Sequence, residues 1–302
     1  MFSTKVNLSG IQLKNPVTVA SGTFGFGKEY GAYYDLSLLG AIAVKGLTLK
    51  PREGNKAPRI AETPSGILNS VGLQNPGIDV FIEEELPFLR KYTAAVIANI
   101  AGNTVEECCE MAEKLGSRVD GIELNISCPN VKEGGVAFGT KCDSVYNITK
   151  HVKMHSRVPL IVKLSPNVTD IVEIASAAQE AGADALSLIN TLLGMAIDIK
   201  SRKPILANIV GGLSGPAVKP VALRMVWQVC KAVNIPVIGM GGISTWEDAV
   251  EFILAGASAI SVGTANFTDP YAPLKILKGI EQYLIENNFN SIDDIRGKLD
   301  VI

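Results

Sequence analysis

Eight short apolar runs, separated by segments with helical periodicity, recur along the whole 302-residue chain. Continuous Val, Ile and Ala predict strands buried on both faces, as in a parallel sheet covered by helices. Strand and helix alternating eight times favour an α/β fold of the closed (β/α)8 type, the TIM barrel. An open doubly wound sheet is the alternative, although no Gly-x-Gly-x-x-Gly turn follows the first run. The runs begin near Pro16, Ala41, Ala94, Asp120, Pro159, Asp184, Ile235 and Ser258.

The spacing of these runs indicates where further structure is inserted. Most starts lie 23 to 26 residues apart, whereas the second, fourth and sixth intervals span 53, 39 and 51 residues. We therefore expect insertions in the second, fourth and sixth βα units. Residues 1–15, with a turn at Gly10, predict an N-terminal β-hairpin that closes the bottom of the barrel. We expect residues 1–302 to form one domain.

Local patterns predict where several helices begin. Residues 169–181 carry apolar side chains on one helical face. Two capping boxes predict helix starts, one at Thr104-x-x-Glu107 and one at Ser244-x-x-Glu247.

The overall composition excludes several classes of protein. The formal charge is −2 and no run of Lys and Arg is long enough to follow a phosphate backbone, so we expect no nucleic-acid partner. The first residues lack the apolar region of a signal peptide, and no apolar run reaches membrane-spanning length. The sequence therefore predicts a cytoplasmic protein that does not bind a membrane.

The cysteines and histidines predict neither disulfides nor a metal site. An odd number of cysteines without a secretory signal indicates reduced thiols. No Cys-x-x-Cys pair is present, and the two histidines, His151 and His155, have no carboxylate or thiol beside them in a metal-binding pattern. We expect both histidines on an exposed helix face. The cysteines are Cys108, Cys109, Cys128, Cys142 and Cys230.

Polar residues follow the predicted strands at their carboxyl ends, where barrels of this type build their active sites. Because a buried Lys or Asn needs a partner, several of them at one barrel mouth indicate a binding site. Ser21, Lys45, Gly46, Asn99, Asn125, Ser127, Cys128, Lys163, Ser165, Asn190, Thr191, Gly241, Gly242, Gly263 and Thr264 stand at these ends.

The glycines after the last two strands indicate a phosphate-bearing ligand. Loops in these positions often bind phosphate through backbone N–H groups. Gly241-Gly242 follows the seventh run and Gly263-Thr264 the eighth, and Gly215 ends a Gly-rich segment in the sixth unit. The pattern alone fits a flavin nucleotide or a sugar phosphate equally.

Cys128 is the candidate catalytic group. It lies where a predicted strand ends, close to Asn125 and Asn130, so its thiol can be held at a reacting carbon. The alternative is a small buried core residue, which is the commonest role of a free cysteine.

Five segments resemble the family 1 dihydroorotate dehydrogenases, which are FMN enzymes of pyrimidine synthesis. The resemblance covers essentially the full length. It is carried by residues 124–130 (LNISCPN), 20–24 (ASGTF), 45–48 (KGLT) with 51–54 (PREG), 69–77 (NSVGLQNPG) and 189–191 (INT).

The resemblance implies a role for each site residue. Cys128 would be the base that removes a proton from dihydroorotate. FMN would contact Ser21, Lys45, Gly46, Asn99, Asn125, Lys163, Ile189, Gly215, Gly241, Gly242, Gly263 and Thr264. The substrate would contact Lys45, Asn69, Ser70, Val71, Gly72, Leu73, Asn125, Asn190 and Thr191.

Within this family, residues 62–66 (ETPSG) and 72–77 (GLQNPG) look more like the NAD-linked type than the fumarate-using homodimers. That resemblance implies a partner, an iron–sulfur flavoprotein subunit that carries FAD and [2Fe-2S], in a heterotetramer with two copies of each chain. Cys128 and the short N-terminus argue against the membrane-attached, quinone-linked family, which uses Ser as its base.

The predicted reaction is the oxidation of dihydroorotate to orotate, with FMN as hydride acceptor and Cys128 as proton acceptor. Residues 131–139 are Gly-rich and could close over the site as a lid or be an ordinary loop. Two further alternatives remain at this stage. One is another phosphate-binding barrel enzyme, and the other is a non-catalytic scaffold subunit.

Overall fold

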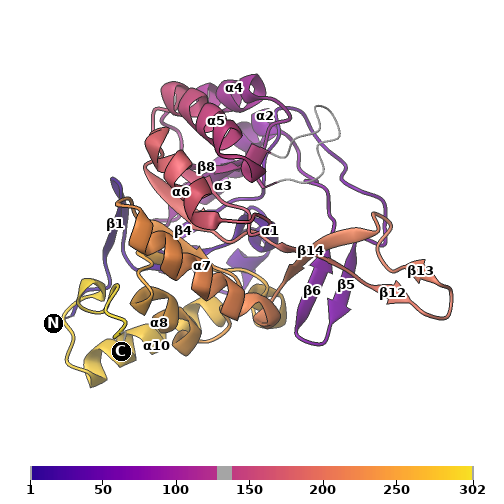
Figure 1. Ribbon diagram of the computed structural model, residues 1–302. Helices are drawn as coiled ribbons and strands as arrows, with labels where there is room; N and C mark the ends of the chain where they lie inside the picture. Colours follow the sequence, from indigo (N-terminus) through magenta and orange to yellow (C-terminus); the bar gives the residue numbers. More distant parts are fainter. Residues whose placement is uncertain (1, 128–137, 301–302) are drawn as a thin grey trace.

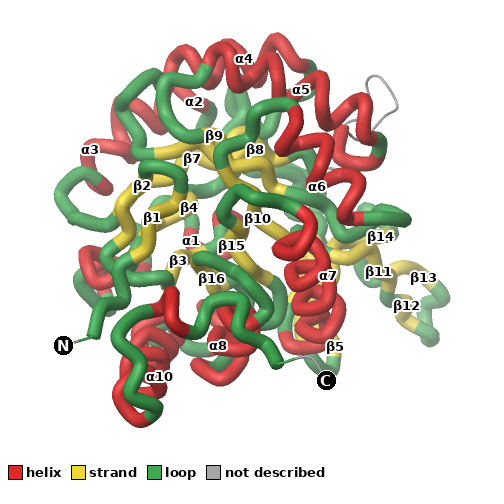
Figure 2. Tube along the Cα trace, turned by 60° about the vertical axis from the view of Figure 1, so that its left-hand side comes forward, coloured by secondary structure: helices red, strands yellow, loops and turns green. Residues whose placement is uncertain are grey.

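The computed structural model describes residues 2–127 and 138–300. Eight parallel strands form a closed barrel in the order β3-β4-β7-β8-β9-β10-β15-β16, so the (β/α)8 prediction is confirmed and the open sheet is excluded (Figures 1 and 2). Each strand lies within a predicted run. The strands are β3 (Val17–Val19), β4 (Ala41–Ala43), β7 (Ala95–Ile100), β8 (Gly121–Asn125), β9 (Leu160–Lys163), β10 (Ala185–Leu188), β15 (Val237–Met240) and β16 (Ala259–Val262).

Helices surround the barrel as an outer ring (Figure 2). The longer ones are α4 (Val105–Leu115), α5 (Cys142–His155), α6 (Ile171–Glu180), α7 (Lys219–Ala232), α8 (Trp246–Leu254) and α10 (Ala272–Glu286). Shorter turns are α1 (Ser21–Phe24), α2 (Ile78–Val80), α3 (Leu86–Leu89), α9 (Ala265–Thr268), the π-helical η3 (Phe81–Glu85), and the 3-10 turns η1 (Tyr30–Ala32), η2 (Leu36–Leu38), η4 (Phe138–Thr140), η5 (Pro216–Val218) and η6 (Ile292–Asp294).

One of the two predicted helix starts is wrong by a single residue. Thr104 caps α4 as expected, because its hydroxyl accepts the Glu107 N–H at 3.2 Å. The second capping box is formed by Thr245 and Asp248 instead of Ser244 and Glu247. The Asp248 carboxylate accepts the N–H groups of both Ser244 and Thr245, at 2.8 and 2.9 Å, and so completes the capping box at the start of α8.

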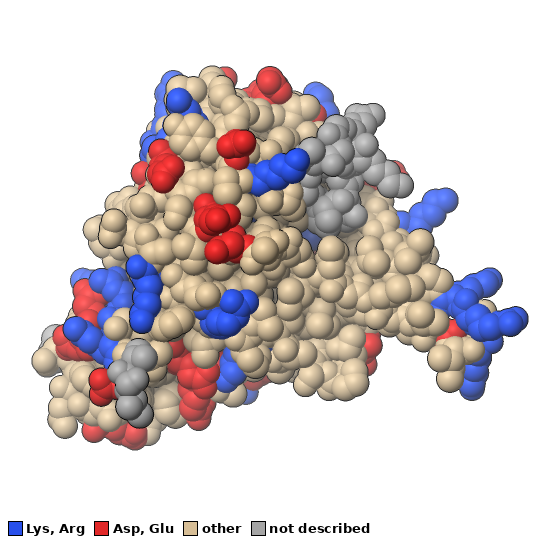
Figure 3. Space-filling view, in the orientation of Figure 1, with Lys and Arg blue, Asp and Glu red and all other residues tan. Residues whose placement is uncertain are grey.

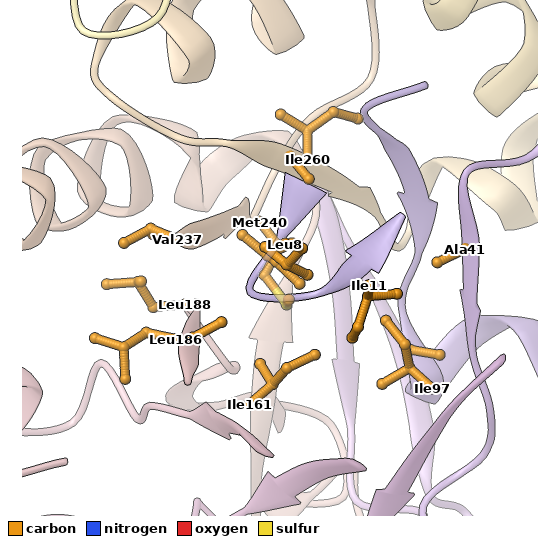
Figure 4. Packing of buried hydrophobic residues seen from close by; sticks show 14 of the residues in the cluster. Leu8, Ile11, Ala41, Ile97, Ile161, Leu186, Leu188, Val237, Met240 and Ile260 are labelled. Atoms are coloured by element: carbon orange, nitrogen blue, oxygen red, sulfur yellow. The ribbon is translucent and has the colours of Figure 1, made fainter. Parts of the chain in front are cut away.

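The predicted N-terminal hairpin is confirmed and closes the barrel bottom. It consists of β1 (Val6–Leu8) and β2 (Ile11–Leu13), paired antiparallel. Leu8 and Ile11 are buried and point from the hairpin into the barrel interior (Figure 4). The Ser9 hydroxyl donates to the Asp184 carbonyl just before β10, which anchors the hairpin at the amino ends of the strands. The opposite, carboxyl ends are therefore free to form a site.

The second and sixth insertions are confirmed, and they join each other. The second unit supplies β5 (Ile60–Thr63) and β6 (Gly66–Asn69), and the sixth supplies β11 (Leu192–Met195) and β14 (Val210–Ser214). These strands form one antiparallel sheet in the order β11-β14-β6-β5. The sequence did not predict this pairing. Gly66 makes it possible, because a side chain there would collide with the Ser214 carbonyl.

A small hairpin extends from this sheet, away from the barrel (Figure 1). It consists of β12 (Ile197–Asp198) and β13 (Lys203–Pro204). The fourth insertion lies between β8 and α5, and residues 128–137 of it are outside the described ranges.

We expect the barrel core to carry most of the stability. Ile260 on β16 is fully buried, so Ile260→Ala should lower the free energy of unfolding by about 2–5 kcal/mol. Ile285 on α10 is 58 % exposed, so Ile285→Ala should change it by less than about 0.5 kcal/mol. Urea unfolding of both variants checks this, and equal losses would contradict the assigned core.

Candidate active site

A cavity of about 380 Å³ lies at the carboxyl ends of the barrel strands and is bordered on its other side by the inserted sheet. Every predicted cofactor- and substrate-binding residue lines it. These residues are Ser21, Lys45, Gly46, Asn69, Ser70, Val71, Gly72, Leu73, Asn99, Asn125, Lys163, Ile189, Asn190, Thr191, Gly215, Gly241, Gly242, Gly263 and Thr264. Cys128 lies outside the described residues, as do residues 131–137 of the predicted lid.

A buried polar cluster, formed by Asn99, Glu123, Lys163 and Ser187, lies beneath this cavity. The Lys163 ammonium lies 3.5 Å from the Glu123 carboxylate, and both side chains are almost fully buried. The same carboxylate accepts the Asn99 amide N–H and the Ser187 hydroxyl. Four adjacent barrel strands thus each contribute one member of the cluster.

Glu123 is the member of this cluster that the sequence analysis missed. Its strand alternates apolar and polar residues, and Glu123 shares the polar face with Asn125 and Ser127. In a closed barrel one face of every strand points inward. The sequence signal that could have revealed Glu123 was therefore a charged residue at an inward-facing position of a barrel strand.

Lys45 follows β4 and contributes a second positive charge to the cavity wall. Burial lowers the pKa of its ammonium from the usual 10.5, and the nearby Arg59 guanidinium lowers it further. Lys45 and Lys163 are the charged side chains among the described lining residues, and no carboxylate is among them. The cavity therefore favours an anionic ligand.

Asparagine side chains form one wall of the cavity through hydrogen bonds across strand ends. The Asn190 amide donates to Asn125 Oδ1 at 3.3 Å, and that oxygen also accepts the Ser127 N–H at 3.2 Å. The Ser127 hydroxyl donates to the Lys163 carbonyl at 3.1 Å. These bonds hold the amide groups in fixed orientations, in which they can form hydrogen bonds with the edge of a planar, polar ring.

Asn167 also lines the cavity, although the sequence analysis did not select it. Its amide donates to the Thr191 carbonyl at 3.0 Å, and its Oδ1 accepts the Leu193 N–H at 2.9 Å. It therefore holds the start of β11 over the strand ends. Ser165, which the sequence placed at a strand end, accepts the Asn167 N–H at 3.2 Å instead of lining the cavity.

The predicted phosphate-binding glycines meet at one side of the cavity. Gly215, Gly241 and Gly242 have φ angles of 105°, 120° and 79°, which favour glycine. A Cβ at Gly242 would lie 2.8 Å from the Lys219 amide nitrogen and 2.9 Å from the Gly215 carbonyl oxygen. Because α7 begins at Lys219, this loop lies against the amino end of a helix, where anions are favoured.

The inserted sheet supplies apolar side chains opposite the strand ends. Ile60, Ile67, Leu193 and Val210 line the cavity on this side, and Phe267 of α9 lines it as well. None of these was predicted. Strand spacing locates an insertion but not its pairing, and Phe267 lies beyond the last predicted strand.

A closed barrel with a cation-lined cavity at its strand ends defines a (β/α)8-barrel enzyme with its active site in the usual place for this fold. A sequence model described as "Dihydroorotate dehydrogenase" matches residues 3–284. The chain belongs to this family, as its sequence motifs predicted.

Curated relatives are similar over almost their whole length. A protein of Alkaliphilus metalliredigens is 62 % identical over 98 % of this chain and 98 % of its own. One of Thermoanaerobacter sp. (strain X514) is 59 % identical over 99 % of this chain and 100 % of its own. One of Geobacter metallireducens is 60 % identical over 98 % of both. Each is named "Dihydroorotate dehydrogenase B (NAD(+)), catalytic subunit".

The described residues contain neither a membrane-spanning helix nor a cluster of metal-ligating side chains. Within residues 2–127 and 138–300, no helix has the length and apolar character to cross a membrane. In the same ranges, no group of three His, Cys, Asp or Glu side chains could hold a metal ion. His151 and His155 both lie on α5. The His155 ring lies 2.6 Å from the Glu113 carboxylate, and the His151 ring contacts the Asn147 carbonyl.

Lys45 is expected to lose its charge at lower pH than an exposed lysine. Burial lowers its pKa, whereas contact with the Asp79 carboxylate raises the pKa of Lys114. NMR titration of ¹³C-labelled lysines should therefore place Lys45 below 10.5 and Lys114 above it. Anion binding in the cavity should weaken over the same alkaline range in which Lys45 deprotonates. A Lys45 that titrates together with Lys114 would contradict the cavity electrostatics.

Proposed function

We propose that this protein oxidises dihydroorotate to orotate in pyrimidine synthesis, with FMN bound in the cavity at the strand ends. One observation carries the proposal. Nineteen residues that the family resemblance implies for FMN and substrate, drawn from all eight βα units, line a single cavity. The names of the relatives agree with this activity.

The cavity fits FMN in three respects. The loop glycines line the cavity beside the amino end of α7, where a phosphate is favoured. Lys45 and Lys163 complement a ligand that carries negative charge. Asn99 Oδ1 is buried at the cavity and has no hydrogen-bond partner within the described structure, so an acceptor is available there.

When bound, FMN supplies the hydride acceptor for C6 of the substrate. The Lys163 ammonium supplies positive charge where negative charge develops during the reaction. Lys45 binds the substrate carboxylate, and the Asn125 and Asn190 amides bind the ring amides and hold the substrate in one orientation. Asn69 to Leu73 and Thr191 complete the substrate side of the site.

The proton at C5 is removed by Cys128. A thiol with a pKa of ~8.5 is slightly ionised at neutral pH and is strongly nucleophilic and basic only as the thiolate. The rate should therefore rise as the pH increases. The assignment rests on the sequence, where Cys128 directly follows Ser127, whose hydroxyl bonds the Lys163 carbonyl.

The natural electron acceptor is NAD⁺, reached through a second polypeptide. This chain has no Cys-x-x-Cys pair to hold an iron–sulfur cluster, and the relatives are named as catalytic subunits. We infer that the partner is an iron–sulfur flavoprotein carrying FAD and [2Fe-2S], and that two copies of each chain assemble. A cytoplasmic location and one domain over residues 1–302 complete the proposal.

Exposed apolar side chains at the cavity mouth support the proposal that the partner subunit binds to this face. Ile60, Leu193 and Phe267 line the cavity and are still 53–54 % exposed. Further apolar side chains follow along the inserted sheet towards the β12–β13 hairpin, whose tip is basic (Figure 3). A chain whose electrons leave through a second polypeptide is expected to carry such an apolar patch near the barrel mouth. Such surfaces commonly mark protein interfaces.

Cys128→Ser should retain FMN and lose turnover roughly 10²- to 10⁴-fold, the usual contribution of a general base. Cys142→Ser, at the start of α5, is the matched control and should keep full turnover. Dihydroorotate oxidation with an artificial dye, measured across pH, checks both variants. Undiminished activity of Cys128→Ser at neutral pH would exclude Cys128 as the base.

The purified chain alone should reduce dyes but reduce NAD⁺ slowly or not at all. Adding the co-expressed partner subunit should restore NAD⁺ reduction. Efficient NAD⁺ reduction by this chain alone would refute the two-subunit proposal. Efficient use of fumarate would instead place it with the homodimeric branch of the family.

A further inference from the structure

We propose that Glu123 is a positioning residue that sets how much positive charge Lys163 presents to the cavity. The inference rests on the proposed function, because it concerns the FMN that Lys163 would help to hold. It goes beyond that function, because neither the sequence motifs nor the relatives' names assign Glu123 any role.

Burying this ion pair costs free energy. The Glu123 side chain is 3 % exposed and that of Lys163 is 6 % exposed, so both groups have lost almost all contact with water. A buried ion pair rarely stabilises a fold more than apolar residues of the same size would. The barrel strands otherwise fill the interior with aliphatic side chains. Packing alone therefore gives no reason for a carboxylate at this place.

The geometry shows which groups fix the carboxylate. One Glu123 oxygen accepts the Ser187 hydroxyl at 2.8 Å, and the other accepts the Asn99 amide. The Lys163 ammonium is farther away, at 3.5 Å, which exceeds the usual ~2.7–2.9 Å of a strong charged hydrogen bond. Asn99 and Ser187 therefore hold the carboxylate, while Lys163 is attracted to it and keeps N–H donors for the cavity.

The same contact fixes the direction of the Asn99 amide. Because its N–H group donates to Glu123, its Oδ1 is left as a buried acceptor without a partner in the described part of the chain. That oxygen lies beneath the Gly46 backbone, since a Cβ at Gly46 would be 2.9 Å from it. Glu123 thus orients two groups at the cavity, the Lys163 ammonium and the Asn99 acceptor.

At the cavity floor, the negative charge of Glu123 therefore offsets part of the positive charge of Lys163. A lone ammonium would favour the negatively charged, reduced form of a flavin more strongly than one paired with a carboxylate. Glu123 therefore lowers the reduction potential of the bound cofactor relative to that of an unpaired Lys163. Removing the carboxylate charge should raise the potential, and the effect should require Lys163.

The test measures the midpoint potential of protein-bound FMN and the FMN dissociation constant. Glu123→Gln should raise the potential and tighten FMN binding by about two- to tenfold, since the cavity floor loses a negative charge beside an anionic ligand. Ser187→Ala should shift the potential in the opposite direction, because a carboxylate with one donor fewer cancels more of the Lys163 charge. Glu286→Gln removes an exposed charge on α10 and is the control, which should leave both values unchanged.

A double-variant comparison separates this role from a general effect of charge. In a Lys163→Met background, Glu123→Gln should shift the potential much less than it does in the wild type. An equal shift in both backgrounds, or no shift in either, would overturn the inference. If Glu123→Gln does not fold, Ser187→Ala decides, and an unchanged potential would overturn it. A wild-type chain that binds no FMN would instead refute the proposed function.

Discussion

The pairing of β16 with β3 is the contact on which the site depends. It joins Ile260 to Val17 and Val262 to Val19, and the Ala20 N–H then donates to the Val262 carbonyl at 2.9 Å. This closure brings the last strand beside the first and makes the carboxyl ends of all eight strands converge. Without it, the lysines, asparagines and glycines of the cavity would lie along an open sheet edge and could not surround one ligand.

A second long-range pairing completes the cavity. Strand β14 pairs with β6, so the insertions of the sixth and second units form one sheet beside the barrel mouth. The barrel then supplies charge and amide groups, while the sheet supplies an apolar border that is partly exposed. Both pairings join distant parts of the sequence, so the site forms only once the whole fold has formed.

Most of the fold could be predicted because the barrel strands carry local patterns. Each strand lies within a short, largely apolar run, and the spacing of these runs located the insertions. The second capping box was off by one residue, since two adjacent pairs of residues fit the pattern and only hydrogen bonds distinguish Thr245–Asp248 from Ser244–Glu247. The β14–β6 pairing could not be predicted, because nothing local in either segment specifies its partner.

The site was predictable where family motifs carry it. Lys45 lies in one of these motifs, whereas Lys163 was found from its place at a strand end, and both line the cavity. Glu123, Asn167 and the apolar border were missed because their roles depend on contacts between strands. The position and role of Cys128 remain predictions from the sequence.

The most direct test is anaerobic addition of dihydroorotate to the purified chain, followed through its visible flavin absorbance. We predict a yellow protein whose flavin absorbance is bleached as orotate forms in equal amount. A chain that purifies without flavin, or a bound flavin that dihydroorotate leaves oxidised, would contradict it.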